Sequence, residues 1–296
     1  MALIEIGGRN YLLYLVLPHR LKMALLSRES RANPDRINSG FNEHAFSGER
    51  AAQYDRLHRY EDDGQHEYPA RALVAEVWAG SRPGGDGDVY GRALELGAGS
   101  GYFTALIARR ARSVIAIEPV ADLQKVARER CAAARLDNVE VVGATAFDLG
   151  AHVPAGSIDS AFLIQSLHHF HRRPEVFAEL GRVVRPGGRL YLVEPHHNLR
   201  RVGRLARKYR RTYRAREHRE DERNWATHDF LTRGELRALC RHGGFGTVRI
   251  ETYWIPYSRR LIPSPDVRFR VERILGRVPL VRHIGAVLAL TARRDA

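Results

Sequence analysis

The sequence predicts an α/β fold in which a mostly parallel sheet is covered by helices on both faces. Two observations lead to this prediction. Strand-like and helix-like segments alternate along the middle of the chain, and the first of these strands runs directly into a glycine-rich turn and a helix. Successive parallel strands need a crossover, usually a helix, that returns the chain to the starting edge of the sheet. With 296 residues, the chain is long enough to bury a full core in such a domain.

The elements are predicted from short apolar runs and from the helical spacing between them. Strands are expected at 92–96, 113–117, 139–142, 159–165, 189–193, 247–253 and 286–292. Helices are expected at 102–110, 121–134, 174–184 and 232–241. The turn Pro186-Gly187-Gly188 introduces the fifth strand, because proline and glycine favour turns. A basic stretch at 197–228 and an irregular segment at 255–284 interrupt the alternation.

The charge balance is strongly basic. The chain carries 48 Lys and Arg against 34 Asp and Glu, a net charge of +14, and Lys22, Lys125 and Lys208 are its three lysines. An alanine- and arginine-rich composition can simply reflect a GC-rich genome. A functional excess would instead attract anionic substrates, membrane surfaces or nucleic acid. Composition leaves both interpretations open, so the location of the charge is the better guide.

The cysteines and the N-terminal residues indicate the compartment. Cys131 and Cys240 lie far apart and without metal-ligand spacing, which favours a reducing environment. The apolar run Tyr11 to Leu17 ends at Pro18 and is too short for a membrane span of ~20 residues. Glu5 stands where a signal peptide would carry positive charge. We therefore expect a cytoplasmic protein without an export signal or a transmembrane helix.

The most informative segment is LELGAGSGYFT, residues 94–104. Its glycines allow backbone torsions closed to other residues and a close approach to a ligand. A dinucleotide fingerprint, G-x-G-x-x-G, would require glycine where the chain has Tyr102. The segment instead resembles the first motif of class I S-adenosylmethionine-dependent methyltransferases, E/D-x-G-x-G-x-G. The resemblance implies a Rossmann-like sheet of seven strands, mostly parallel with the last strand antiparallel.

The resemblance continues in order along the chain. Glu118 ends the second strand, where the family holds the cofactor's ribose through a carboxylate, which can accept two hydrogen bonds from a vicinal diol. Residues 142–146 resemble the adenine-contact turn, with Thr145 in place of the usual Asp. Residues 159–170 and 182–188 match the fourth strand with its loop and the turn into the fifth strand. Tyr54 resembles a tyrosine that reaches the amino-acid end of the cofactor.

The resemblance therefore implies S-adenosylmethionine as the cofactor. The residues expected to bind it are Tyr54, Glu95, Gly97, Ala98, Gly99, Gly101, Glu118, Pro119, Thr145, Ala146 and Gln165.

Catalytic residues are expected after the fourth and fifth strands, because ligands of such sheets bind beyond the carboxyl ends of the strands. His168, His169 and His171 follow the fourth strand, and Glu194 ends the fifth. Similar His-His loops occur in methyltransferases that act on small-molecule hydroxyls. We expect His168 or His169 as a general base supported by Glu194. No metal is expected, since no further ligand stands at fitting spacing.

The basic charge is concentrated between Arg200 and Arg219, which hold ten basic residues against the single acid Glu217. This stretch is either a solvated helix or part of a cap that supplies cations to an anionic acceptor. We expect two regions: an N-terminal extension at 1–45 and a methyltransferase domain at 46–296. Insertions near 197–228 and 255–284, together with the extension, would form the substrate cap.

The predicted function is methyl transfer to a small-molecule acceptor, with the hydroxyl of a secondary metabolite, sugar or lipid-like compound favoured. An anionic acceptor and peripheral membrane contact are both compatible with the charge. Two alternatives stay open: a nucleic-acid methyltransferase, favoured by the net charge of +14, and a cofactor-binding scaffold without turnover. The base-modifying motif Asn/Asp-Pro-Pro-aromatic is replaced by QSLH at residues 165–168, which argues against amino methylation of bases.

Overall fold

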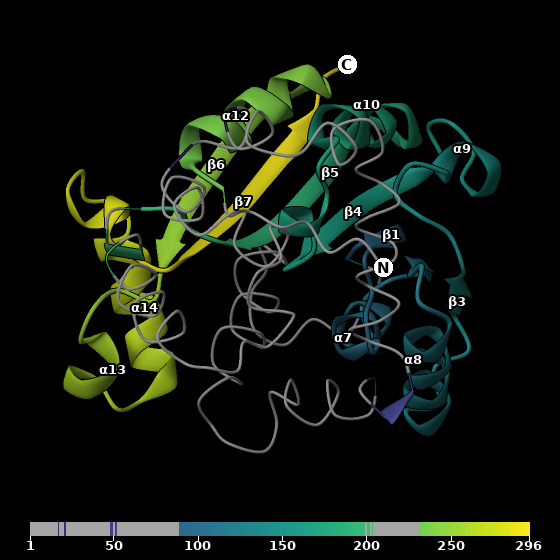
Figure 1. Cartoon of the computed structure of the whole chain (residues 1–296), viewed down its shortest axis with the longest axis horizontal. Coiled ribbons are helices and arrows are strands. Elements are labelled where there is room, and N and C mark those ends of the chain that lie inside the picture. Colours follow the sequence, from purple (N-terminus) through teal and green to yellow (C-terminus); the bar gives the residue numbers. More distant parts are fainter. Residues whose placement is uncertain are drawn as a thin grey trace, which may run out of the picture.

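The computed structural model describes residues 89–198 and 231–296, with positions 17, 21, 48, 49, 51, 200, 201 and 203. At its centre is a seven-stranded sheet in the order β3-β2-β1-β4-β5-β7-β6 (Figure 1). The strands are β1 (Arg92–Leu96), β2 (Ser113–Ile117), β3 (Val139–Val142), β4 (Ile158–Ile164), β5 (Val184–Pro195), β6 (Phe245–Tyr253) and β7 (Val287–Arg294). Strand β7 is antiparallel to both β5 and β6, and the other neighbours are parallel. The predicted Rossmann-like fold is confirmed.

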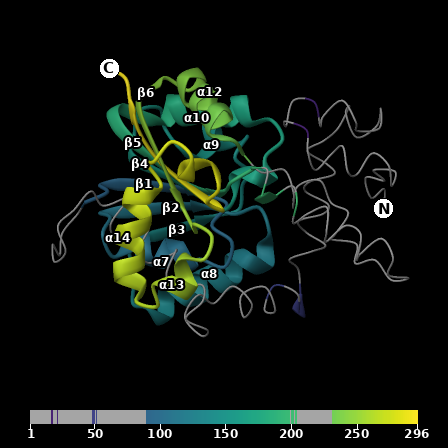
Figure 2. The same cartoon turned by 90° about the vertical axis from the view of Figure 1, so that its left-hand side faces the viewer.

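Helices cover both faces of the sheet, as Figures 1 and 2 show. One layer contains α7 (Tyr102–Ala108), α8 (Ala121–Ala133) and α14 (Pro265–Leu275). The other contains α9 (Leu149–His152), α10 (Arg173–Val183) and α12 (Arg233–His242). Alternate residues of each strand supply the two cores: Leu94 and Leu96 of β1 pack on the α10 side, and Ala93 packs on the α7 side.

Strand β5 begins five residues before its predicted start. Ile158 pairs with Val184 and Ser160 pairs with Arg189, so residues 185–188 bulge out of the ladder. The Asp159 carboxylate anchors this irregularity, accepting hydrogen bonds from the Arg92 backbone N–H at 2.7 Å and from Arg185 Nε at 2.5 Å. The turn predicted at 186–188 therefore lies within a strand, held by a partner that is distant in sequence.

The segment 255–284, predicted to be irregular, is largely helical. It contains α13 (Ser258–Leu261), α14 and the 3-10 helix η6 (Val281–His283). Proline at N1 or N2 and Gly276 at the C-cap delimit α14. Val267, Ile274 and Leu275 are exposed, so the helix lacks the continuous core-facing apolar stripe from which a surface helix is predicted. The segment leaves β6 at Tyr253 and returns at Val287, which are paired at the carboxyl edge of the sheet.

Several predicted features lie outside the described residues: Tyr54, nearly all of the extension 1–45, and the Arg200–Arg219 stretch apart from positions 200, 201 and 203. Within the described part of the chain, no helix is long and apolar enough to cross a membrane.

Candidate active site

The predicted site residues that the structure describes gather at one edge of the sheet. Strands β1, β2, β4 and β5 run parallel, so the residues that follow them meet at their common carboxyl edge. The 3-10 helix η3 (Leu167–His169) follows β4 at this edge. The Ser166 hydroxyl donates to the Leu96 carbonyl at 2.7 Å, which fixes the β4 loop against the end of β1.

The glycine turn after β1 has the backbone that the motif requires. Gly97, Gly99 and Gly101 have φ of +74°, +56° and +75°, in the left-handed region that favours glycine. A Cβ on Gly97 would lie 2.6 Å from the Ser166 Cβ, and one on Gly101 would lie 2.8 Å from the Ala127 Cα. The turn can therefore approach the β4 loop and α8 closely only because these side chains are absent.

Glu118 turns its carboxylate back toward the glycine turn. Its two oxygens accept hydrogen bonds from the Gly99 N–H at 2.8 Å and the Val120 N–H at 3.0 Å. Burial raises the pKa of Glu118 to about 6, although these two backbone hydrogen bonds act in the opposite direction. A carboxylate has about four acceptor positions, so each oxygen keeps acceptor capacity for a further donor.

Glu95 lies inside the domain rather than at its edge. The Thr104 hydroxyl of α7 donates to Glu95 Oε2 at 2.5 Å, which links the two elements that flank the glycine turn. Burial raises the pKa of Glu95 to about 8, and the nearby Glu118 adds to the increase. Glu95 is therefore predominantly protonated at neutral pH. A neutral carboxyl group is suited to this buried position, where it supports the glycine turn through Thr104.

The turn after β3 contains an acid that the motif comparison did not identify. The Thr145 hydroxyl donates to Asp148 Oδ2 at 2.6 Å and accepts from the Phe147 N–H at 3.2 Å. Thr145 therefore organises the turn, and its partner Asp148 brings an exposed carboxylate to it. The turn therefore carries an acid at position 148, three residues after the threonine that stands where the family usually has Asp.

His168 and Glu194 form a buried pair across the ends of β4 and β5. The distance from His168 Nδ1 to Glu194 Oε2 is 2.7 Å, and Glu194 Oε1 accepts the Leu167 N–H at 2.7 Å. Glu194 is fully buried. Burial raises its pKa to about 7, against the Leu167 hydrogen bond and the positive charge of Arg173. An Nδ1–H donated to the carboxylate leaves the ring lone pair on Nε2, the arrangement that a histidine base needs.

His169 is placed less favourably for proton transfer. Burial, together with the neighbouring His168, lowers its pKa to about 3. The two rings are tilted, with centroids 4.2 Å apart. A ring this weakly basic is a poor proton acceptor near neutrality, so the geometry favours His168 over His169.

Arg173 supports this loop from the start of α10. Its side chain is 1% exposed; Nη1 contacts Glu235 Oε1 of α12 at 2.5 Å, and Nε donates to the Phe170 carbonyl at 3.0 Å. Sequence reasoning missed Arg173 because its partner lies 62 residues away. In the sequence, nothing next to Arg173 predicts that its side chain is buried.

The remaining predicted residues lie around the same edge. Ala98 and Ala146 are buried, Gln165 is half-buried with φ of +52°, and Pro119 is exposed beside Glu118. Ala51, three residues before Tyr54, packs on Val120 and Leu123. In the described ranges, no group of three or more His, Cys, Asp or Glu side chains is placed to hold a metal ion.

Comparison with known proteins identifies the class. Residues 94–192 match the family described as a methyltransferase domain. These residues cover the glycine turn, the Glu118 strand end, the His168 loop and most of β5. The chain carries a class I S-adenosylmethionine-dependent methyltransferase domain, and S-adenosylmethionine is the cofactor of that class. Both predictions are confirmed.

Individual relatives agree at the level of the domain. An uncharacterized methyltransferase of Mycobacterium tuberculosis is 32% identical over 130 residues, 44% of this chain and 46% of that protein. The chain thus spans about half the length of the curated relatives it matches first. A possible histamine N-methyltransferase of Thermotoga maritima has a TM-score of 0.53 at 18% identity, covering 86% of this chain and 99% of that one. A phosphoethanolamine N-methyltransferase of Haemonchus contortus has a TM-score of 0.54 at 13% identity, covering 86% and 59%. The two structures support the fold alone.

Proposed function

We propose that this protein transfers the methyl group of S-adenosylmethionine to a hydroxyl of a small-molecule acceptor, with His168 as the general base. The observation that supports this most strongly is the 2.7 Å contact between His168 and the buried Glu194, at the carboxyl edge beside the glycine turn. A hydroxyl is a weak nucleophile until its proton is removed, and an imidazole held by a carboxylate suits that task near neutral pH.

The residues at the carboxyl edge fit the cofactor. The three left-handed glycines let the backbone come close to a ligand, and each oxygen of Glu118 can accept one hydroxyl of a ribose in addition to its backbone donor. Bound S-adenosylmethionine supplies an activated methyl group on a sulfonium leaving group. The chain's own residues then have to align the acceptor, exclude water and accept its proton.

The Glu194 carboxylate has two roles in this proposal. It orients the His168 ring through Nδ1, and it stabilises the imidazolium that forms when Nε2 accepts the acceptor's proton. Its second oxygen is held by the Leu167 N–H, so the carboxylate cannot rotate without losing a buried hydrogen bond.

The function is tested by incubating the protein with methyl-labelled S-adenosylmethionine and fractionated cell extract, and by locating the label by mass. We expect a labelled small molecule whose added methyl is an ether. A methyl ester would instead identify a carboxylate acceptor, which needs no general base. Label recovered in nucleic acid would instead identify a nucleic-acid methyltransferase. Cofactor binding without label in any fraction would identify a scaffold protein.

Glu118→Ala is expected to weaken S-adenosylmethionine binding at least tenfold by calorimetry. Two charge-assisted hydrogen bonds are removed, each worth on the order of 1.5–3 kcal/mol before water compensates. Glu118→Gln serves as the matched variant, because it keeps the size and one acceptor oxygen and should lose less. An unchanged dissociation constant in a folded Glu118→Ala protein would place the ribose elsewhere.

Cofactor affinity is also expected to fall as pH is lowered through about 6. The folded-state pKa of Glu118 is raised to about 6, so its carboxylate is present above that pH and is lost below it. If binding needs the ionised form, the dissociation constant should rise about tenfold between pH 7 and pH 5. Glu118→Gln should flatten this profile, whereas an equal pH dependence in both proteins would assign it to another group.

A further inference from the structure

We infer that the segment 257–284 is a docking surface for an anionic lipid bilayer. Nine large apolar side chains are exposed in the described part of the chain, and eight of them belong to this one segment. They are Tyr257, Leu261, Val267, Ile274, Leu275, Val278, Leu280 and Ile284. Leu280 is 83% exposed and Ile274 is 67% exposed. Exposed apolar side chains that are concentrated in this way mark an interaction surface, whereas scattered single ones are ordinary.

Helix α14 buries two charged residues, Arg268 and Glu272, and exposes three apolar ones, Val267, Ile274 and Leu275. Arg268 and Glu272 are buried toward the sheet with Phe269, which stacks on Tyr253 at a centroid distance of 5.2 Å. Val267 and Ile274 are exposed seven residues apart, so they share the outer face. A surface helix normally has the opposite arrangement. Its outer face is therefore built for contact with something other than water.

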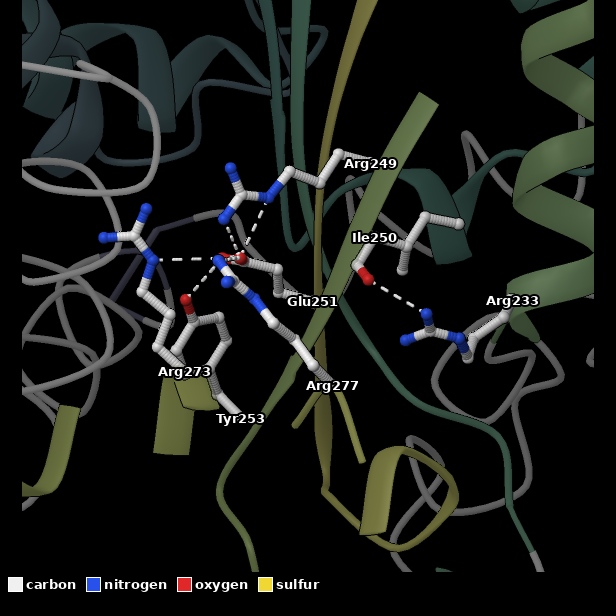
Figure 3. A network of polar contacts seen from close by, with 7 residues as sticks. All are labelled: Arg233, Arg249, Ile250, Glu251, Tyr253, Arg273 and Arg277. Atoms are coloured by element: carbon white, nitrogen blue, oxygen red, sulfur yellow. Dashed lines mark hydrogen bonds and ion pairs between the residues drawn. The ribbon is translucent and has the colours of Figure 1, made fainter. Parts of the chain in front are cut away.

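Two buried carboxylates hold α14 in this orientation. Glu272 accepts the Trp254 N–H at 2.9 Å and the Ile255 N–H at 3.3 Å. On β6, Glu251 accepts from Arg277 Nη2 at 2.8 Å and from the Tyr253 hydroxyl at 2.7 Å (Figure 3). Burial would raise the pKa of Glu251, but its arginine and tyrosine hydrogen bonds outweigh burial and lower it. The contacts of these two carboxylates thus fix the orientation in which α14 exposes its apolar side chains.

The charge of the segment selects the partner. Residues 257–284 contain seven arginines and two acids, a net charge of +5. Arg268 and Glu272 are buried, and two further arginines of the segment pair with Glu251. Arg259, Arg260 and Arg270 are exposed. Two copies of this chain pressed together on this surface would bring like charges together, which disfavours a symmetric dimer. Arginines among exposed leucine and isoleucine side chains match a bilayer, where headgroups meet the cations and acyl chains meet the apolar groups.

The position of the segment connects this surface to the candidate active site. It leaves β6 at Tyr253 and returns at Val287, and Val287 also pairs with Pro195, the residue after Glu194. The segment is therefore rooted at the carboxyl edge that carries the His168–Glu194 pair. A protein bound to a membrane through this segment would hold that edge near the bilayer.

The test is flotation with vesicles of phosphatidylcholine alone or mixed evenly with phosphatidylglycerol, at fixed moderate salt and without cofactor or acceptor. The wild-type protein should float with the mixed vesicles, bind pure phosphatidylcholine at least tenfold more weakly, and be released by high salt. The variant Ile274→Ser/Leu280→Ser should bind the mixed vesicles at least tenfold more weakly. Arg260→Gln/Arg270→Gln should lose the preference for phosphatidylglycerol.

Matched controls are Leu21→Ser, which alters an exposed leucine outside the segment, and Arg109→Gln, which alters an exposed arginine after α7. Both should float like the wild type, and circular dichroism should show that all variants are folded.

Equal flotation of Ile274→Ser/Leu280→Ser and the wild type would overturn the inference. A failure of the wild type to bind mixed vesicles would also overturn it, as would a dimer that these two substitutions dissociate, or a preference for nucleic acid over vesicles. None of these outcomes depends on methyl transfer.

Discussion

His168→Ala is expected to lower the turnover of methyl transfer by about 10²- to 10⁴-fold, the usual effect of losing a general base. The ring lies 2.7 Å from a buried carboxylate that orients it, so water cannot reproduce a base at the same position. Cofactor affinity should be preserved, because the groups proposed to hold the cofactor are the glycine turn and Glu118 and not this ring. Turnover with the identified acceptor and calorimetry with the cofactor measure the two effects separately.

The pH profile and two further variants make this prediction specific. Turnover should fall as pH drops below about 7, because protonation of Glu194 removes the anion that supports the imidazolium. His171→Ala, which removes another buried histidine of the same loop, should retain most of the turnover. A rate independent of pH between 5.5 and 8, with near-normal turnover in His168→Ala, His169→Ala and Glu194→Gln, would favour an acceptor that needs no base.

Arg173→Met should destabilise the fold by about 3 kcal/mol, in the range found when one partner of a buried ion pair is removed. The substitution deletes the 2.5 Å contact with Glu235 and the hydrogen bond to the Phe170 carbonyl, and it leaves both acceptors partly buried. Chemical denaturation followed by circular dichroism measures the change. Because Arg173 lowers the pKa of Glu194, the acidic limb of the turnover profile should also move to higher pH.

The matched control is Arg185→Met, which removes an ion pair with Asp159 from a side chain that is 52% exposed. Exposed pairs contribute about 0–1 kcal/mol, so this variant should stay close to the wild type. If Arg173→Met and Arg185→Met had the same denaturation midpoint, Arg173 would not be the link between the histidine loop and α12.

Local patterns allowed most of the domain to be predicted. The runs that became β1, β2 and β3 have the predicted bounds, because short buried strands and the glycine turn are specified by neighbouring residues. The pairing of His168 with Glu194 could also be anticipated, since His168 follows β4 and Glu194 lies near the end of β5, its parallel neighbour. The contact between Thr145 and Asp148 could not be anticipated, because it depends on the conformation of the turn and not on the spacing of the motif.

The sequence alone therefore determined the class of domain, the cofactor and the edge of the sheet where the chemistry is proposed, because those depend on residues close together or on the order of strands. Only the tertiary structure decided that β5 starts early, that Arg173 is buried against Glu235, and that α14 exposes several apolar side chains while it buries charged ones. Each of these depends on a partner distant in the sequence: Asp159 for the bulge, Glu235 for the arginine, and β6 for the helix. Helical periodicity shows that a face is apolar, but the direction in which that face points is set by which buried polar groups find partners on the sheet.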